Sequence, residues 1–499
     1  MQLSLGEVAA LLGASCGAPA RVVSDYSIDS RTLSPGSLFF AIHGPRFDGH
    51  DFVEDSFRRG AAGAVVESGF EKRLFHDKVD PHAWASALIP VHDTTAALQD
   101  LARIVRRRWG QRLVAVTGST GKTTTKELIV AALATRFSVH KSPGNLNNQY
   151  GVPLALLALE PTHEAAVLEL GMSAPGEIAH LARIAEPQVG VVTNVAAAHL
   201  QFFESVDAIA RAKRELIENL KRPATAVLNH DDERVRRFGE GFPGRMITFG
   251  FGEGADIRAR DFRLRNGEGG QRVTSVFRVR TPSYETEFEL ALPGRHNVEN
   301  ALAALAVAEA FEIPSPDLVQ ALYNFQPLAR RTELLRLAGN VIVIDDSYNS
   351  NPRAMEQMLD TLAAWPDAVR RIVVAGEMLE LGPESPELHR RIGRFSAERG
   401  VDLLIAVAGD AHCFVEGAVA AGMPPQQAHF FAGAEEAGRF CRDGIRPGDV
   451  ILVKGSRAVH LERAVELLCQ ADVAPAVFHD LESGAMVEAK DEGHRTTDN

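Results

Sequence analysis

The sequence predicts an α/β protein of three domains: a small α/β N-terminal domain, a central domain with a mostly parallel sheet, and a Rossmann-like C-terminal domain. Three observations support this prediction. The 499 residues are too many for one core of ordinary size. Apolar β-type runs alternate with amphipathic helical segments over most of the chain, as in parallel sheets covered by helices. One strand-to-helix junction carries the turn GSTGKT, which is typical of phosphate-binding loops.

Changes of pattern along the chain set the expected boundaries. We expect the N-terminal domain over 1–106, the central domain over 107–328, the C-terminal domain over 329–481 and a disordered polar tail over 482–499. A helix enters the first boundary, and we expect its arginines, Arg106 to Arg108, to form a solvated end.

The expected strands follow from short apolar runs between amphipathic segments. In the central domain they lie at 113–117, 165–170, 189–193 and 226–228. In the C-terminal domain they lie at 341–345, 372–375, 403–407, 429–431 and 450–453. Residues 256–292 alternate in polarity and predict an antiparallel appendage.

Composition excludes several classes of partner. The net charge is −12, from 53 Lys and Arg against 65 Asp and Glu, which argues against binding to nucleic acid or an anionic membrane. The 4 cysteines have no C-x-x-C spacing, as expected in a reducing compartment. The N-terminus has no basic leader before an apolar core, and no apolar run reaches the roughly 18 residues of a membrane span. We therefore expect a cytoplasmic protein.

The turn GSTGKTT predicts a nucleotide-phosphate site. Its backbone N–H groups and the following helix N-terminus favour phosphate oxygens, Lys122 adds a positive charge, and Thr123 offers a hydroxyl to Mg²⁺. The spacing G-x-x-G-K-T is shorter than the common P-loop spacing, and an ordinary glycine turn is the alternative. The predicted nucleotide-binding residues here are Gly118, Ser119, Thr120, Gly121, Lys122, Thr123 and Thr124.

Two further groups lie at the end of, or just beyond, predicted strands of the same sheet. Glu169 ends the run AVLE, and His199 follows the strand at 189–193. Because parallel strands present their carboxyl ends at one edge, both side chains are candidate metal ligands beside Thr123. The alternatives are a solvent-exposed glutamate and a structural histidine.

Lys213 lies at the centre of the apolar stripe of the helix predicted at 206–220. A buried, unpaired ammonium costs several kcal/mol or loses its proton, and a neutral lysine amine is reactive. The alternative is that only the aliphatic part of the Lys213 side chain is buried and that its ammonium group reaches solvent.

Asn297 and Asn300 lie one helical turn apart at the start of a predicted helix. Together they offer amide donors and acceptors to a flat partner such as a nucleotide base. Helix capping explains Asn297 alone.

These motifs together resemble the Mur ligase family of ATP-dependent amide-forming enzymes, over nearly the whole chain. The resemblance implies that ATP binds the Gly118–Thr124 loop, with the base near Asn297 and Asn300, and that Arg331 and Asp346 complete its site. It also implies that Lys213, in an Ala-Lys context, is carbamylated. Two magnesium ions would then lie at Thr123, Glu169, His199 and Lys213, and Lys122, His199, Lys213 and Arg331 would serve catalysis.

Within the family, the chain is similar to the members that add D-alanyl-D-alanine to UDP-N-acetylmuramoyl-tripeptide for peptidoglycan synthesis. The segments GNLNNQYGVP, AAAHL and DDSYNSNP carry this likeness. It implies a UDP-binding surface and a peptide site, and we expect a monomer. The implied substrate-binding residues are Asp29, Ser30, Arg31, Asn145, Asn147, Asn148, Tyr348, Asn349 and Asn351.

Three alternatives stay open. The preceding ligase of the pathway, which adds the third amino acid, has an Asx-Asn-Pro-Arg type motif that Ser350–Arg353 resembles at a different place in the chain. A kinase acting on a hydroxyl would use the same phosphate loop without a lysine in its metal site. A non-catalytic nucleotide switch would need neither an acceptor nor a third domain with polar strand ends.

Overall fold

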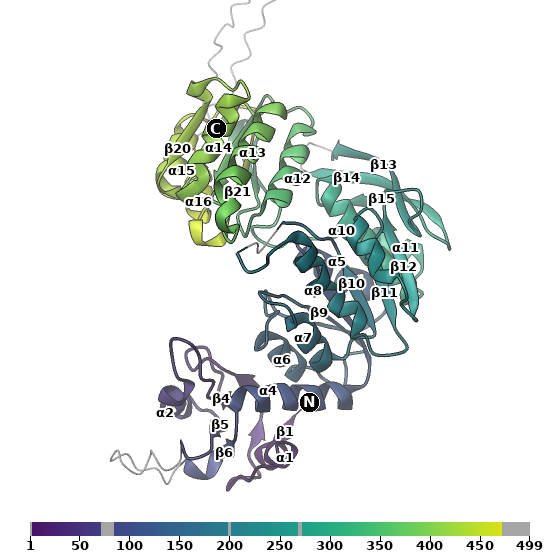
Figure 1. The fold of residues 1–499 in the computed structure, drawn as a ribbon, viewed down its shortest axis with the longest axis vertical. Helices are drawn as coiled ribbons and strands as arrows, with labels where there is room; N and C mark the ends of the chain where they lie inside the picture. The colour runs from purple at the N-terminus through teal and green to yellow at the C-terminus, as the bar shows by residue number, and fades with distance from the viewer. Residues whose placement is uncertain (1, 71–83, 198–200, 268–271, 472–499) are drawn as a thin grey trace, which may run out of the picture.

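The computed structural model describes residues 2–70, 84–197, 201–267 and 272–471. Three principal sheets follow one another along the long axis of the molecule, in the order of the chain (Figure 1). This arrangement confirms the predicted three-part α/β architecture. The predicted tail lies outside the described residues.

The N-terminal part is a small sheet with its own core. Its strands run in the order β3-β4-β5-β6, all parallel, and a two-stranded β1-β2 pair lies beside them. The apolar run Ser37–Phe40 is buried as β4. The elements are β1 (Leu3–Ser4), α1 (Leu5–Leu11), β2 (Val22–Val23), β3 (Asp25–Ser27), β4, α2 (Val53–Arg58), β5 (Gly63–Glu67) and β6 (Leu88–Val91).

The long helix α4 (Thr94–Trp109) joins this part to the central one. Asp93 caps its start, and Gly110, in the left-handed conformation, ends it. Its apolar side lies in one core cluster with residues of β4 and of the central helices. The boundary predicted at 106/107 therefore falls inside a helix.

The expected solvated helix end is wrong for Arg106, which is only 1% exposed. Its Nε donates to the Ala185 carbonyl at 2.7 Å, and Nη2 donates to the Glu186 carbonyl at 3.1 Å. These carbonyls end the helix α7 (Glu177–Ala185), where a positive charge is favoured. Arg106 thus ties α4 to the central domain.

The central sheet has nine strands in the order β15-β14-β13-β12-β11-β10-β7-β9-β8. The strands from β8 to β13 are parallel, and β13, β14 and β15 pair antiparallel. The segment predicted as an antiparallel appendage is antiparallel, but its strands β13, β14 and β15 extend the central sheet and do not form a separate one. The strands are β7 (Arg112–Thr117), β8 (Val139–Lys141), β9 (Ala165–Glu169), β10 (Val189–Val192), β11 (Thr225–Asn229), β12 (Arg245–Gly250), β13 (Ile257–Asn266), β14 (Val273–Arg280) and β15 (Glu285–Leu290).

Helices cover both faces of the central sheet. Alternate residues of β7 point to opposite cores: Leu113 and Ala115 to the core with α6, α7 and α8, and Val114 and Val116 to the core with α5, α10 and α11. The helices are α5 (Lys122–Leu133), α6 (Gly151–Leu157), α8 (Val206–Glu218), α9 (Glu233–Arg236), α10 (Arg295–Ala310) and α11 (Ser315–Tyr323).

The C-terminal sheet runs β16-β17-β21-β18-β19-β20 and is parallel apart from β16. Cores lie on both of its faces. Its strands are β16 (Glu333–Leu337), β17 (Val341–Asp345), β18 (Arg370–Gly376), β19 (Leu403–Val407), β20 (Ala428–Phe431) and β21 (Asp449–Lys454). Its helices are α12 (Pro352–Ala363), α13 (Ser385–Glu398), α14 (His412–Ala420), α15 (Ala434–Asp443) and α16 (Glu462–Leu468).

All nine strands expected from apolar runs are present within one to three residues of their predicted ends. In the central and C-terminal sheets, the strands not predicted are β8, β12 and β16, and each of them has exposed or half-buried positions. A strand without a continuous apolar run gives little sequence signal. In the described part of the chain, no helix is both long and apolar enough to cross a bilayer.

We predict that Arg106→Ala lowers the free energy of unfolding by about 2–4 kcal/mol, because it leaves buried carbonyls without donors. Urea denaturation followed by circular dichroism measures the change. Arg108→Ala is the matched control, since Arg108 is exposed on the same helix and should change stability by less than about 0.5 kcal/mol. Equal losses in both variants would contradict this role of Arg106.

Candidate active site

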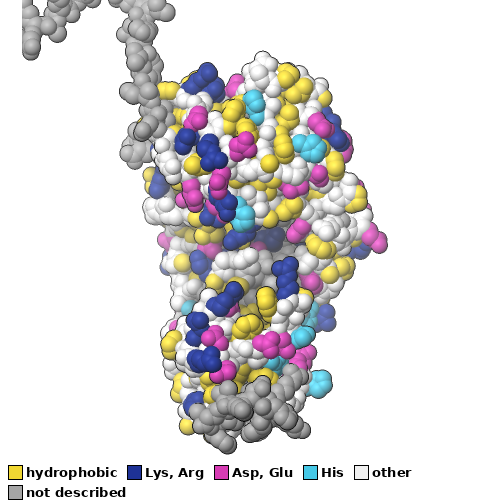
Figure 2. Space-filling model, turned by 90° about the vertical axis from the view of Figure 1, so that its left-hand side faces the viewer, with side chains coloured by type: hydrophobic (Ala, Val, Ile, Leu, Met, Phe, Trp, Pro, Cys, Tyr) yellow, Lys and Arg dark blue, Asp and Glu magenta, His cyan; other side chains and the backbone are white. Residues whose placement is uncertain are grey.

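A cleft of about 1200 Å³ lies where the central domain meets the C-terminal domain. The carboxyl ends of β7, β9 and β10 open into it from one side, and those of β17, β18 and β21 from the other. On the face shown in Figure 2, lysine and arginine side chains lie around a hollow at mid-height. Residues far apart in the chain thus meet at one site, as expected for sheets that bind ligands at their carboxyl ends.

The predicted phosphate loop, residues 118–124, lines this cleft between β7 and α5. Gly118 has φ +154°, and a Cβ there would lie 1.8 Å from the Thr193 hydroxyl. Gly121 has φ +78°, and a Cβ would meet Asn300 Oδ1 at 2.3 Å. The turn therefore requires both glycines, for conformation and for space.

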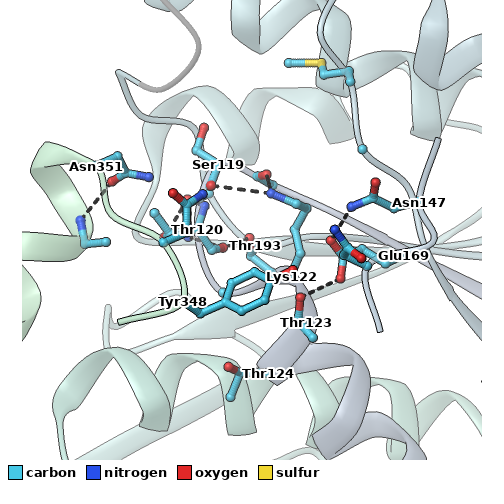
Figure 3. Close-up of a pocket in the computed structure, with 18 of the residues that line it drawn as sticks. Ser119, Thr120, Lys122, Thr123, Thr124, Asn147, Glu169, Thr193, Tyr348 and Asn351 are labelled. Atoms are coloured by element: carbon cyan, nitrogen blue, oxygen red, sulfur yellow. Dashed lines mark hydrogen bonds between the residues drawn. The ribbon is translucent and has the colours of Figure 1, made fainter. Parts of the chain in front are cut away.

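Two residues that the sequence analysis missed hold this loop. Thr193 Oγ1 donates to the Thr120 carbonyl at 2.7 Å, and Asn194 Oδ1 accepts the Thr120 N–H at 3.0 Å. They follow β10 directly, so their signal in the sequence was a polar pair at a strand end. Figure 3 shows Thr193 beside Thr120.

Lys122 begins α5, and its Nζ donates to the Gly118 carbonyl at 2.9 Å. Burial lowers the pKa of Lys122, the nearby charge of Glu169 raises it, and that of Arg331 lowers it. An ammonium held in this way lies over the turn and is placed for phosphate oxygens.

Thr123, Glu169 and Asn147 form a chain of hydrogen bonds (Figure 3). Thr123 Oγ1 donates to Glu169 Oε2 at 2.7 Å, and Asn147 Nδ2 donates to Glu169 Oε1 at 2.8 Å. Thr123 and Glu169 are 5% and 3% exposed. A hydroxyl and a carboxylate this close are the hard oxygen donors that Mg²⁺ prefers, so the residues fit a magnesium site.

Lys213 lies on α8, lines the cleft and is 2% exposed, as its place on the apolar stripe predicted. Burial lowers its pKa well below the usual value, and the positive charge of Lys122 lowers it further. Among the described residues, no carboxylate pairs with its amine. Both effects favour the neutral amine of Lys213 over its ammonium, and the neutral amine is the form that reacts with carbon dioxide.

The other predicted nucleotide and metal residues have mixed outcomes. Predicted ligand His199 lies outside the described residues. Asn297 and Asn300 are buried at the start of α10 and line the cleft. Asn300 Nδ2 donates to Asn297 Oδ1 at 3.3 Å, and Thr125 Oγ1 donates to Asn300 Oδ1 at 3.1 Å. Their amides thus also join α10 to α5, and base binding stays a prediction.

The C-terminal wall of the cleft is built around Asp346. Lys454 Nζ donates to Asp346 Oδ2 at 2.5 Å, and the Thr332 N–H donates to Oδ1 at 3.0 Å. Arg331 lies over the Tyr348 ring, 4.0 Å from its centre. No individual role was predicted for Lys454, because only the adjacency of β17 and β21 brings it to Asp346.

The predicted substrate residues divide into two groups. Asn145, Asn147, Asn148, Tyr348, Asn349 and Asn351 line the cleft. The side chains of Asn148 and Asn351 also accept backbone N–H groups, Asn351 as the cap of α12. Asp29, Ser30 and Arg31 lie in the N-terminal domain, outside the lining of this cleft. Arg31 and Asp29 pair with each other at 2.7 Å.

Models of three Mur ligase domains match this chain: the Mur ligase family catalytic domain at 23–106, the Mur ligase middle domain at 116–308 and the Mur ligase glutamate ligase domain at 330–457. The chain belongs to the Mur ligase family.

Particular relatives are similar over most of their length. The UDP-N-acetylmuramoyl-tripeptide–D-alanyl-D-alanine ligase of Bacillus subtilis (strain 168) is 32% identical, over 91% of this chain and 94% of its own. The crystal structure of MurF from Acinetobacter baumannii superposes with a TM-score of 0.83 at 30% identity, covering 94% and 99% of the two chains. MurF of Thermotoga maritima in complex with ADP gives 0.77 at 29% identity, covering 90% and 97%.

His296 lies on the wall of the cleft, and its burial predicts that the free energy of unfolding depends on pH. Burial lowers its pKa to about 4, and Lys454 lowers it as well while Asp346 raises it. No described residue hydrogen-bonds to its Nδ1. The folded protein therefore holds this imidazole neutral, whereas the unfolded chain takes up a proton near pH 6.5.

Because the unfolded state binds more protons between pH 6.5 and about 4, His296 lowers the free energy of unfolding as pH falls through this window. We predict that His296→Gln removes on the order of 2 kcal/mol of this acid destabilisation. Urea titrations at pH 7 and pH 4.5 of wild type and variant measure it. His43→Gln is the control, since the His43 side chain is 71% exposed. An unchanged pH dependence in His296→Gln would contradict the prediction.

Proposed function

We propose that the chain is an ATP-dependent, ADP-forming ligase that adds D-alanyl-D-alanine to UDP-N-acetylmuramoyl-tripeptide in peptidoglycan precursor synthesis. The observation that carries this proposal is the single cleft in which the phosphate loop faces the strand ends of the C-terminal domain. The named relatives, similar over about nine-tenths of their chains, support the same reaction.

The reaction needs an activated carboxyl group, because a carboxylate resists attack by an amine. ATP held at residues 118–124 transfers its γ-phosphoryl group to the terminal carboxylate of the tripeptide, which gives an acyl phosphate and ADP. The free amine of D-alanyl-D-alanine attacks the acyl carbon, and the tetrahedral intermediate expels phosphate to leave the amide. The amine loses a proton in this step. Lys122 lies where it stabilises the negative charge on the transferring group.

Thr123, Glu169, His199 and carbamylated Lys213 would hold two magnesium ions. Magnesium bound there supplies positive charge between the phosphate and carboxylate anions. The hydrogen bond between Thr123 and Glu169 already brings two of these oxygen donors together. Arg331 and Asp346, from the facing wall, complete the site for ATP, so movement of the C-terminal domain gates the chemistry.

The electrostatic surroundings of Lys213 support its carbamylation. Its neutral amine attacks carbon dioxide, a C–N bond forms and a proton leaves to solvent, so that a carbamate anion replaces an amine. The change reverses the unfavourable interaction with the Lys122 charge and provides oxygen ligands.

The preceding ligase of the pathway is disfavoured by the position of Arg353. Its Nη1 lies 3.4 Å from Asp232 Oδ2 and 3.4 Å from the Val195 carbonyl, both in the central domain. Asn351 caps α12. The segment Ser350–Arg353 therefore joins two domains here and does not present a free guanidinium to an amino-acid carboxylate.

Two further predictions belong to this proposal. We infer a cytoplasmic location, where ATP is available, and a monomer. We expect no nucleic-acid partner and no membrane insertion, in keeping with the net charge of −12.

Incubation with ATP, Mg²⁺, UDP-muramoyl-tripeptide and D-alanyl-D-alanine should give the pentapeptide product, detected by mass spectrometry. Phosphate release should depend on both the tripeptide and the dipeptide. Release with ATP and a hydroxyl acceptor alone would favour a kinase. Product from UDP-muramoyl-dipeptide and a single amino acid would favour the preceding ligase.

The carbamate has its own test. With ¹³C-labelled bicarbonate, wild-type protein should show a carbamate resonance that Lys213→Ala lacks, and the variant should lose more than about 100-fold in kcat. Lys221→Ala is the matched control, since Lys221 is exposed and pairs with Glu186. Short carboxylic acids should partly restore the Lys213→Ala activity. A carbamate signal that persists in Lys213→Ala would rule out this residue.

A further inference from the structure

The C-terminal wall of the cleft carries three cationic side chains, Arg331, Lys454 and Arg457. Lys454 is neutralised by Asp346 at 2.5 Å. Among the described residues, neither Arg331 nor Arg457 pairs with a carboxylate. Both guanidinium groups lie over the Tyr348 ring, at 4.0 and 5.2 Å from its centre. Two unneutralised cations on one wall indicate that anions bind there.

The two arginines serve different parts of the cleft. The charge of Arg331 acts on Lys122 and lowers its pKa, which places Arg331 on the side of the phosphate loop. Arg457 follows β21 at the start of a short 3₁₀ turn, Arg457–Val459. In the proposed site, Lys122 and Arg331 bind the phosphates of ATP. No anion has yet been proposed for Arg457.

The backbone next to Arg457 is fixed. The Ser456 N–H donates to the Glu377 carbonyl at 3.0 Å, and Ser456 Oγ accepts the Leu379 N–H at 2.9 Å. These bonds tie the loop after β21 to the loop after β18. Leu379, Ser456 and Arg457 all line the cleft. The backbone that carries the exposed Arg457 side chain is therefore held in place at the edge of the cleft.

We propose that Arg457, supported by the Tyr348 ring, binds the terminal carboxylate of the incoming dipeptide and so determines specificity for an acceptor with a free carboxyl end. This assignment rests on the proposed ligase function. The acceptor is a zwitterion whose amine must reach the acyl phosphate, while its carboxylate must stay away from the phosphate anions. A planar guanidinium matches a carboxylate with two parallel hydrogen bonds and meets this need.

Comparison of two acceptors tests the pairing directly. In D-alanyl-D-alaninamide the terminal carboxylate is replaced by a neutral carboxamide, and the reacting amine is unchanged. For wild-type protein we expect the amide to raise the acceptor KM about 10- to 100-fold with a smaller effect on kcat. For Arg457→Gln we expect a similar rise in KM for the dipeptide itself, and less than about threefold difference between the two acceptors. The KM for ATP should not change.

Arg439→Gln is the matched control, because Arg439 is an exposed arginine of the same domain outside the cleft. Arg457→Lys keeps the charge and should recover part of the discrimination. Thermal unfolding and binding of Mg²⁺-ADP verify that each variant is folded. If Arg457→Gln does not fold, the Arg457→Lys variant and the comparison of the two acceptors with wild-type protein still test whether Arg457 binds the carboxylate.

Several results would overturn the assignment. Wild-type protein could use both acceptors equally, Arg457→Gln could keep full discrimination, or the discrimination could be lost in Arg331→Gln instead. Failure of the ligase function gives a different result, since wild-type protein would then make no pentapeptide with either acceptor.

Discussion

Two lysine side chains lie near one another in the cleft, the half-buried Lys122 and the buried Lys213, and the rest of the site depends on how their charge is balanced. Desolvation lowers the pKa of both lysines, and the positive charge of Lys122 lowers the pKa of Lys213 further. Glu169 offsets the charge of Lys122 but is committed to Thr123 and Asn147. Both effects favour the neutral, reactive form of the Lys213 amine, and substrate phosphates and metal ions would complete the balance of charge.

The same electrostatic constraint operates on the facing wall. Asp346 neutralises Lys454, whereas the two arginines over Tyr348 pair with no carboxylate of the described residues, which supports the proposal that they bind anionic groups of the substrates. Beside the cleft, Arg353 of the C-terminal domain pairs with Asp232 of the central domain.

The fold was predictable where apolar runs are long and buried. In the central and C-terminal domains every strand expected on that basis is present, whereas β8, β12 and β16 of the same domains were not predicted. Arg106 was assigned to a solvated helix end because helix periodicity does not reveal that a distant helix terminates against it. The antiparallel segment was recognised by its alternation, but its pairing with β12 depends on contacts between separate strands.

The sequence by itself determined the phosphate loop, the strand-end position of Glu169 and the burial of Lys213, because each follows from local pattern: a glycine spacing, the end of a strand and the centre of a helical stripe. Tertiary structure alone decided which distant groups meet. Lys454 reaches Asp346, Asn194 holds Thr120, and Arg457 lies beside Tyr348 only because parallel strands bring their carboxyl ends together at one edge. Such neighbours are far apart in the chain, and no local periodicity encodes their distance.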